Sequence, residues 1–131
     1  MTPWILVALA LAGCDAGKAP PRRPSIVLTD CRLDGLAAPA ACGTLEVLED
    51  RSATPGRRIS LRVAVAPALF KPAAPDPLFV LVGGPGQAAT EVGPAVAQSL
   101  SALRRTRDMV FVDQRGTGSS HPLDCALHEE D

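Results

Sequence analysis

The sequence predicts an α/β fold in which an antiparallel hairpin is followed by a parallel strand, helix and strand. Three observations point to it: two alternating apolar and polar segments around a Pro-Gly turn, two continuous apolar runs that end in glycine-rich loops, and a helical apolar period between those runs. The chain has 131 residues, of which 47% are hydrophobic and 21% charged, as expected for one small domain. Its 13 Lys and Arg stand against 14 Asp and Glu. Without a basic excess, we expect no nucleic-acid partner.

The first two predicted strands carry apolar residues at every second position. Leu45 and Val47 alternate with polar residues, and the segment Ile59 to Val65 alternates in the same way. Between them, residues 50–58 contain Pro55-Gly56, a turn signal. We therefore expect an antiparallel hairpin, followed by a Pro-rich loop over residues 67–77.

The next segment predicts a crossover between two parallel strands. Residues 78–82 and 109–112 are continuous apolar runs, typical of strands covered on both faces. Between them, Pro94 predicts the first position of a helix that ends in a cationic stretch at residues 104–107. The apolar residues at helical spacing are Val96, Leu100 and Leu103. Strand, helix and strand then form a right-handed βαβ unit.

The loop after the first apolar run is a candidate binding site for a negatively charged oxygen. It consists of Gly83, Gly84, Pro85 and Gly86, followed by Gln87. Glycines let the backbone turn sharply after a strand and bring N–H groups close to a ligand, and Pro85 stiffens the turn. Such a loop suits an oxyanion hole, in which amides stabilise the charge of a tetrahedral intermediate. An ordinary tight turn is the alternative interpretation.

The loop after the second apolar run is expected to support that site. It begins with Asp113, Gln114, Arg115 and Gly116. The charged side chains can hold neighbouring loops by ion pairs and hydrogen bonds, while Gly116 permits a compact turn. We interpret them as structural support, because no proton acceptor stands beside a nucleophile here.

The N-terminus predicts export. Residues 4–12 form an apolar run that is too short to span a bilayer and ends in small residues. Residues 11–14, Leu-Ala-Gly-Cys, resemble a bacterial lipobox, in which the Cys14 thiol is acylated. We therefore expect a signal peptide with lipobox over residues 1–14, a Pro-rich linker over 15–30 and the folded region over 31–131. The protein is then exported to the cell envelope or periplasm and attached to a membrane through Cys14. An ordinary cleaved signal peptide and a buried N-terminal segment are the alternatives.

The remaining cysteines predict a disulfide. In an oxidising compartment, Cys31 and Cys42 are expected to form a bridge around a short loop. No His or C-x-x-C motif accompanies them, so we expect no metal site. Cys125 is left without a partner in this scheme.

Three segments together resemble the proline iminopeptidase and tripeptidyl aminopeptidase group of α/β-hydrolases. They are Cys-Gly-Thr-Leu-Glu-Val at residues 42–47, Leu-Val-Gly-Gly-Pro-Gly-Gln at 81–87 and Val-Asp-Gln-Arg-Gly-Thr-Gly at 112–118. The resemblance covers residues 31–127 and implies the N-terminal portion of a cofactor-independent serine hydrolase. That enzyme would cleave N-terminal residues from peptides, or small amides and esters, with the Gly84 amide as the oxyanion donor. Val82 stands where many members have His, which favours the exported hydrolases over the proline iminopeptidase subgroup.

The catalytic residues of that family have no counterpart in the sequence. There is no G-x-S-x-G nucleophile motif, and the two histidines, His121 and His128, lie in a polar tail. We expect a fragment that is inactive by itself, with Val110 and Phe111 incompletely buried and an open sheet edge.

Two other functions fit parts of the sequence. One is a non-enzymatic lipoprotein that keeps a partial hydrolase scaffold as a binding module. The other is a dinucleotide-binding half-domain, because residues 84–89 fit the pattern G-x-G-x-x-A after a strand. Pro85 and the Gly93-Pro94 pair count against the nucleotide interpretation, as does export.

Overall fold

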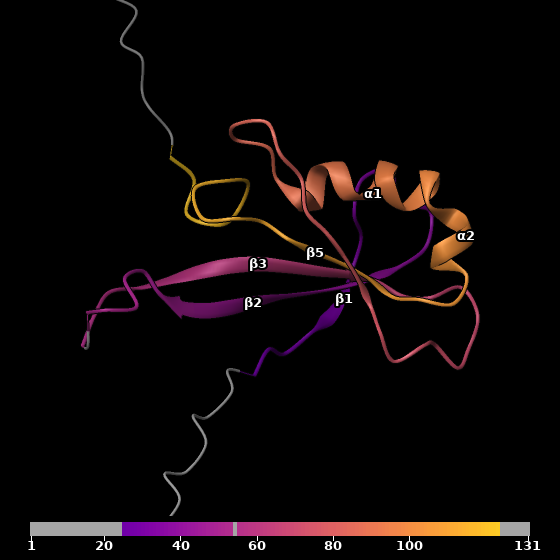
Figure 1. The fold of residues 1–131 in the computed structure, drawn as a ribbon, viewed down its shortest axis with the longest axis horizontal. Helices are drawn as coiled ribbons and strands as arrows, with labels where there is room; N and C mark the ends of the chain where they lie inside the picture. The colour runs from indigo at the N-terminus through magenta and orange to yellow at the C-terminus, as the bar shows by residue number, and fades with distance from the viewer. Residues whose placement is uncertain (1–24, 54, 124–131) are drawn as a thin grey trace, which may run out of the picture.

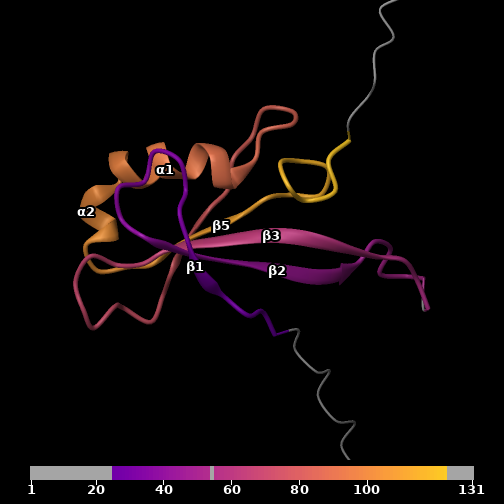
Figure 2. The ribbon, with the colours of Figure 1, turned by 180° about the vertical axis from the view of Figure 1, so that it is seen from behind.

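A computed structural model describes residues 25–53 and 55–123, which form a single mixed β-sheet with helices on one face (Figures 1 and 2). The strands are β1 (Thr29–Cys31), β2 (Ala40–Leu48), β3 (Arg58–Ala66), β4 (Leu78–Val80) and β5 (Met109–Val112), and the helices are α1 (Ala89–Ser99) and α2 (Ser101–Arg104). In space the strands are ordered β1-β2-β3-β5-β4. The predicted α/β class is confirmed.

The predicted hairpin is present as β2 and β3. They pair antiparallel, with Leu45 opposite Leu61 and Val47 opposite Ile59. The turn is closed by a backbone hydrogen bond of 2.8 Å from the Glu49 N–H to the Arg57 carbonyl and by an ion pair between their side chains. The hydrogen bond from the Arg57 side chain holds the pKa of Glu49 below its ordinary value.

The predicted parallel unit is present as well. β4 and β5 pair parallel, with Leu78 opposite Met109 and Val80 opposite Phe111. β5 also pairs antiparallel with β3, so the last of the described strands lies inside the sheet. Helices α1 and α2 connect β4 to β5. Because the two strands are parallel, the loops that follow them lie at the same end of the sheet, the carboxyl end of these strands.

The core lies between α1 and the sheet and is centred on Phe111. Met109 and Phe111 are fully buried, and Val110, on the other face of the sheet, is half-buried. A Cβ atom on Gly93 of α1 would lie 2.4 Å from Cδ1 of Phe111, so the helix backbone rests directly on the ring. The expectation that Phe111 would be incompletely buried is therefore wrong, because α1 covers it without any later strand.

The apolar run at residues 78–82 forms a shorter and more exposed strand than predicted. β4 ends at Val80 and lies at the edge of the sheet, where Phe79 is 59% exposed and Leu81 is 80% exposed. The sequence predicted that this strand would be covered on both faces, and the exposure of Phe79 and Leu81 shows that this prediction is wrong. A continuous apolar run is typical of central parallel strands, but here no described element covers the second face of β4.

The helix also differs from the prediction. It begins at Ala89, so that Pro94 lies inside α1 rather than at its first position. Leu100 leaves the helical conformation, with φ −98° and ψ 30°, and separates α1 from the short helix α2. The apolar period continued across this break and gave no sign of it.

Strand β1 was not predicted. It pairs with β2, with Thr29 opposite Cys42, and its first two residues fall in the stretch assigned to the linker. The predicted disulfide between Cys31 and Cys42 is confirmed, with a Cα to Cα distance of 5.7 Å. A strand of three residues held by a covalent bridge carries too short a pattern to be found from alternation.

Candidate functional site

The glycine loop after β4 forms a tight, exposed turn. The Gln87 N–H donates a hydrogen bond of 3.3 Å to the Gly84 carbonyl, with Pro85 and Gly86 at the central positions. Gly86 has φ +89°, as the third residue of a type II turn requires, and Gly84 has φ +91°. No atom outside its immediate neighbours lies within 4 Å of a Cβ position on Gly83 or Gly86. The turn hydrogen bond does not use the Gly84 N–H as donor.

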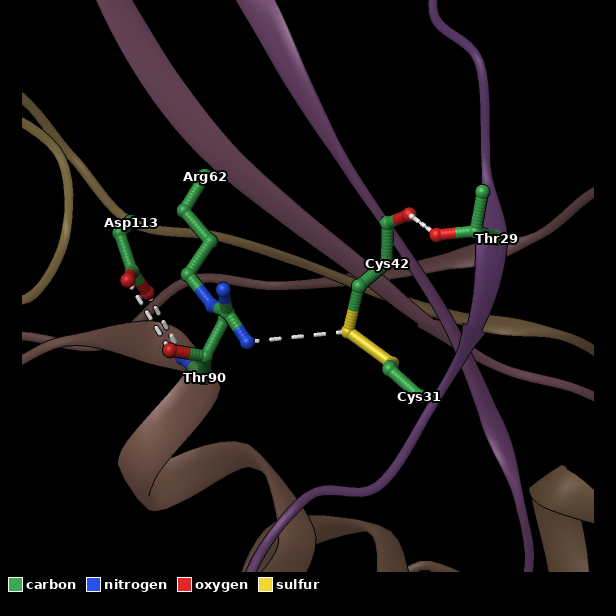
Figure 3. Close-up of a disulfide and its surroundings, with 6 residues drawn as sticks. All are labelled: Thr29, Cys31, Cys42, Arg62, Thr90 and Asp113. Carbon is green, nitrogen blue, oxygen red and sulfur yellow. Dashed lines mark hydrogen bonds between the residues drawn. A yellow bond between two sulfur atoms is a disulfide. The ribbon is translucent and has the colours of Figure 1, made fainter.

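Asp113 connects the second loop to the beginning of α1 (Figure 3). It follows β5 directly and is fully buried. Its carboxylate accepts hydrogen bonds from the Thr90 N–H at 2.8 Å, the Thr90 hydroxyl at 2.9 Å and the Ser119 N–H at 3.4 Å. A negative charge against the first turn of a helix is stabilised by the amides and the helix dipole there. The carboxylate therefore takes the place of a side-chain cap, which the N-cap residue Ala88 lacks.

The two predicted loops lie against each other. A Cβ on Gly118 would lie 2.6 Å from the Ala88 Cβ and 2.6 Å from Asp113 Oδ2. Gly118 has φ +49°, so its backbone comes close to the start of α1 in a conformation that side chains disfavour. The turn after β4 and the loop after β5 are thus joined at residues 88 and 118.

The other residues of the second loop are more exposed. The Arg115 side chain donates hydrogen bonds to the carbonyls of Glu49 at 3.2 Å and Leu48 at 3.0 Å, at the end of β2. Gln114 is exposed, and its carbonyl accepts hydrogen bonds from the Thr117 N–H and hydroxyl. Gly116 has φ +82° and turns the loop back on itself.

Two serines follow in this loop, and the structure gives them backbone roles. Ser120 is fully buried, and its hydroxyl accepts a hydrogen bond of 2.8 Å from the Arg62 N–H of β3. His121 is exposed, with φ +58°. The buried Ser120 hydroxyl is therefore occupied in fixing the loop to the sheet.

A polar depression of about 310 Å³ lies beside the start of α1. Sequence reasoning missed two of its residues, Thr90 and Arg62. Arg62 lies on the same face of β3 as Arg58 and Ser60 and as Ala64 and Ala66, which pack in the core, so the alternation of this strand gave no signal for it. Figure 3 shows its side chain between the Asp113–Thr90 pair and the disulfide, with Nη2 3.8 Å from the Cys42 sulfur. The depression is lined by Arg32, Leu33, Asp34, Arg62, Thr90, Glu91 and Ser119.

At the depression beside the start of α1, backbone amides and the Arg62 side chain can bind oxygen atoms. Within residues 25–53 and 55–123, no group of three His, Cys, Asp or Glu side chains could hold a metal ion. The predicted lipidation site, Cys14, and the remaining Cys125 lie outside the described residues.

Two comparisons with known proteins found no match. No family model matches the chain, and no curated protein matches it. Among the described residues, no helix has the length and apolar character needed to cross a membrane.

Proposed function

We propose that the chain is the N-terminal part of an exported serine hydrolase with an α/β-hydrolase fold, in which the Gly84 amide donates to the oxyanion. The observation that carries this proposal is the place of the glycine turn. The turn comes after β4 and before α1. The loop after β5, the parallel neighbour of β4, binds the first turn of α1 through Asp113. Open α/β sheets bind their ligands at this edge, outside the carboxyl ends of parallel strands.

The geometry of the turn suits this role. Gly84 and Gly86 both have positive φ, and the Gln87 hydrogen bond fixes the turn while it uses the Gly84 carbonyl rather than its N–H. An amide fixed in advance stabilises the developing charge without reorganisation, and one such donor is worth about 3–4 kcal/mol. Buried Asp113 supports the turn indirectly, because it holds the first residues of α1 in place.

The structure favours this function over dinucleotide binding. In a dinucleotide-binding domain, the pyrophosphate lies against the N-terminus of the helix after the glycine loop. Here the Asp113 carboxylate already accepts a hydrogen bond from the Thr90 N–H in the first turn of α1. A phosphate at this position would meet a buried negative charge.

The substrate class is taken from the resemblance to the aminopeptidase group. We propose that the complete enzyme acts on the N-terminal end of peptides, or on small amides and esters, and needs no cofactor. We also propose that the signal peptide and an acylated Cys14 place it in the cell envelope on a membrane surface. The nucleophile, acid and His are then expected after residue 131.

The test starts from the encoding DNA downstream of residue 131. We expect a G-x-S-x-G motif, followed by an acid and a His, in the same reading frame. The extended chain should react with a fluorophosphonate at that serine, whereas the 131-residue chain should remain unlabelled at Ser119 and Ser120. The absence of the motif from all three frames would contradict the proposal. It would favour the alternative, a lipoprotein binding module, which should then be resistant to proteolysis by itself.

The role of the turn is tested in the extended chain with a matched pair of glycines. Gly84→Ala strains a residue at φ +91° in the turn, and Gly35→Ala strains one at φ +81° outside it, where a Cβ meets only an ordinary contact with Pro94. Displacing an oxyanion donor should lower kcat by about 100-fold with little change in KM. Gly35→Ala should leave kcat unchanged. Equal effects of the two variants on kcat would show that the turn has no catalytic part.

A further inference from the structure

An exposed apolar surface lies at the opposite end of the sheet from the glycine turn. We call it the α2 patch: Leu69 and Phe70 in the β3–β4 loop, together with Leu100 and Leu103 at α2. Their exposed fractions are 53%, 55%, 37% and 44%. Figure 1 shows α2 and the β3–β4 loop together at one end of the molecule, while the segment between β4 and α1 lies toward the other.

The α2 patch is a fixed surface rather than a loose loop. The Leu69 N–H donates a hydrogen bond of 3.1 Å to the Arg104 carbonyl, and the Phe70 N–H donates one of 2.9 Å to the Arg105 carbonyl. The Arg105 guanidinium lies 5.0 Å from the centre of the Phe70 ring. Between these elements is an open depression of about 500 Å³, which is lined by Leu69, Phe70, Ser101, Ala102 and Arg105.

The α2 patch carries an excess of positive charge. Residues 67–77 and 100–108, which form it, contain four cations and two acids. Both acids already face a cation: Lys71 Nζ lies 3.8 Å from Asp108, and Arg107 lies 3.1 Å from Asp76. These two segments therefore carry two positive charges that no acidic side chain of the described residues pairs with.

Those two charges belong to Arg104 and Arg105. Within the described part of the chain neither forms a salt bridge. Arg104 is only 7% exposed, and its Nε and Nη2 have no hydrogen-bond partner among the described residues. Arg105 is exposed and can contact an anion directly, whereas the buried Arg104 adds its charge to this end of the molecule without reaching the surface.

We propose that the α2 patch docks on the surface of an anionic phospholipid bilayer. An aromatic ring and leucines enter the boundary between headgroups and acyl chains, while neighbouring Arg and Lys side chains contact the phosphates. Ten residues lie between Cys14 and Ser25, the first described residue, so eleven Cα-to-Cα steps join the two. Fully extended they reach about 36–40 Å, so a chain attached at Cys14 can bring this end to the membrane. Docking would leave the glycine turn directed away from the lipid, and this goes beyond the proposed hydrolase function.

The test measures the depth of two single tryptophans in the full chain on vesicles. Trp4→Phe removes the one native Trp. Phe70→Trp then reports on the α2 patch, and Phe79→Trp, on β4, is a matched control because the two phenylalanines are 55% and 59% exposed. The vesicles contain phosphatidylcholine and phosphatidylglycerol with brominated acyl chains, which quench tryptophan on contact.

We expect quenching of the residue-70 tryptophan to be several-fold stronger than that of the residue-79 tryptophan. The difference should shrink when phosphatidylglycerol is replaced by phosphatidylcholine, and when Lys71→Gln and Arg105→Gln are combined. The two single-tryptophan variants share the same N-terminal attachment, so their difference does not depend on how the N-terminus binds the vesicle. Equal quenching at both positions, or a chain that does not sediment with vesicles, overturns the proposal. Unquenched tryptophan at residue 70 that is nevertheless shielded from acrylamide would also overturn the proposal, because a second copy of the chain would then cover the patch.

Discussion

Replacement of Asp113 tests whether the buried carboxylate holds the two loops of the site together. It accepts hydrogen bonds from the Thr90 N–H and hydroxyl and from the Ser119 N–H, and it is closed to solvent. Asp113→Ala removes all three acceptor contacts at once. Asp113→Asn keeps one carbonyl oxygen, which can accept the hydrogen bond from the Thr90 N–H. Its NH₂ group then faces the Ser119 N–H, which loses its acceptor, and the negative charge at the helix terminus is lost.

The expected magnitude follows from these contacts. Each buried donor that loses its acceptor costs about 1–3 kcal/mol, and the Thr90 hydroxyl can turn to another acceptor. The Thr90 N–H is a buried donor, whereas the Ser119 N–H belongs to an exposed residue that water can reach, so with the lost charge at the helix terminus Asp113→Ala should lower the free energy of unfolding by about 2–4 kcal/mol. Asp113→Asn should lower it by about 1–2 kcal/mol, because the helix loses a favourable charge and one amide loses its acceptor.

Urea unfolding followed by circular dichroism measures both values. The matched control is Asp108→Asn at the other end of β5, where the carboxylate accepts one hydrogen bond of 2.7 Å from the Ala68 N–H. The amide oxygen can keep that bond, so the loss should stay below about 1 kcal/mol. Hydrogen exchange at the Thr90 amide should accelerate in both Asp113 variants. If Asp113→Ala costs no more than the control and Thr90 remains protected, the carboxylate does not hold the loops.

Three further substitutions probe the backbone and the core. Gly93→Ala gains about 1 kcal/mol of helix propensity but places a methyl group against the Phe111 ring. We therefore expect the free energy of unfolding, measured by thermal unfolding, to fall by about 1–2 kcal/mol. The Gly93→Ala/Phe111→Leu double variant should recover part of this loss. A stabilised Gly93→Ala single variant would refute the contact. Replacing Cys31 and Cys42 by Ser opens a loop closed across a sequence separation of 11 and should lower stability by about 2–3 kcal/mol; an unchanged urea midpoint would contradict this. Gly86→Ala, at φ +89° with open space around the new atom, should cost about 1–2 kcal/mol from backbone strain alone, whereas D-Ala introduced there by semisynthesis should be tolerated.

The parts of the fold that follow local periodicity were predictable. Alternation identified β2 and β3, and the Pro-Gly turn between them gave their antiparallel pairing. The apolar run at Met109–Val112 gave β5, and glycine chemistry identified the turn after β4. These features depend on residues close together in the sequence, where backbone preference and side-chain pattern agree.

The features that depend on distant contacts were missed. Thr90 and Arg62 become part of the site only because the loop after β5 reaches α1 and β3. The start of α1 follows the contact of Asp113 with Thr90, across 23 positions, and not the preference of Pro94 for a first helical position. The burial of Phe111 depends on a glycine in a helix, and a helical glycine by itself suggests weak helix rather than close packing.

The position of β5 in the sheet has a consequence for biosynthesis. Among the described strands, β4 pairs only with β5, which leaves the ribosome after the other four. Until then the segment Leu-Phe-Val-Leu-Val at residues 78–82 has no partner strand, and it has the high β-propensity and lack of charge that promote aggregation. A chain interrupted before residue 109 would display that segment permanently. We expect such nascent chains to depend on chaperones that bind short apolar segments, and release should coincide with the appearance of Met109–Val112.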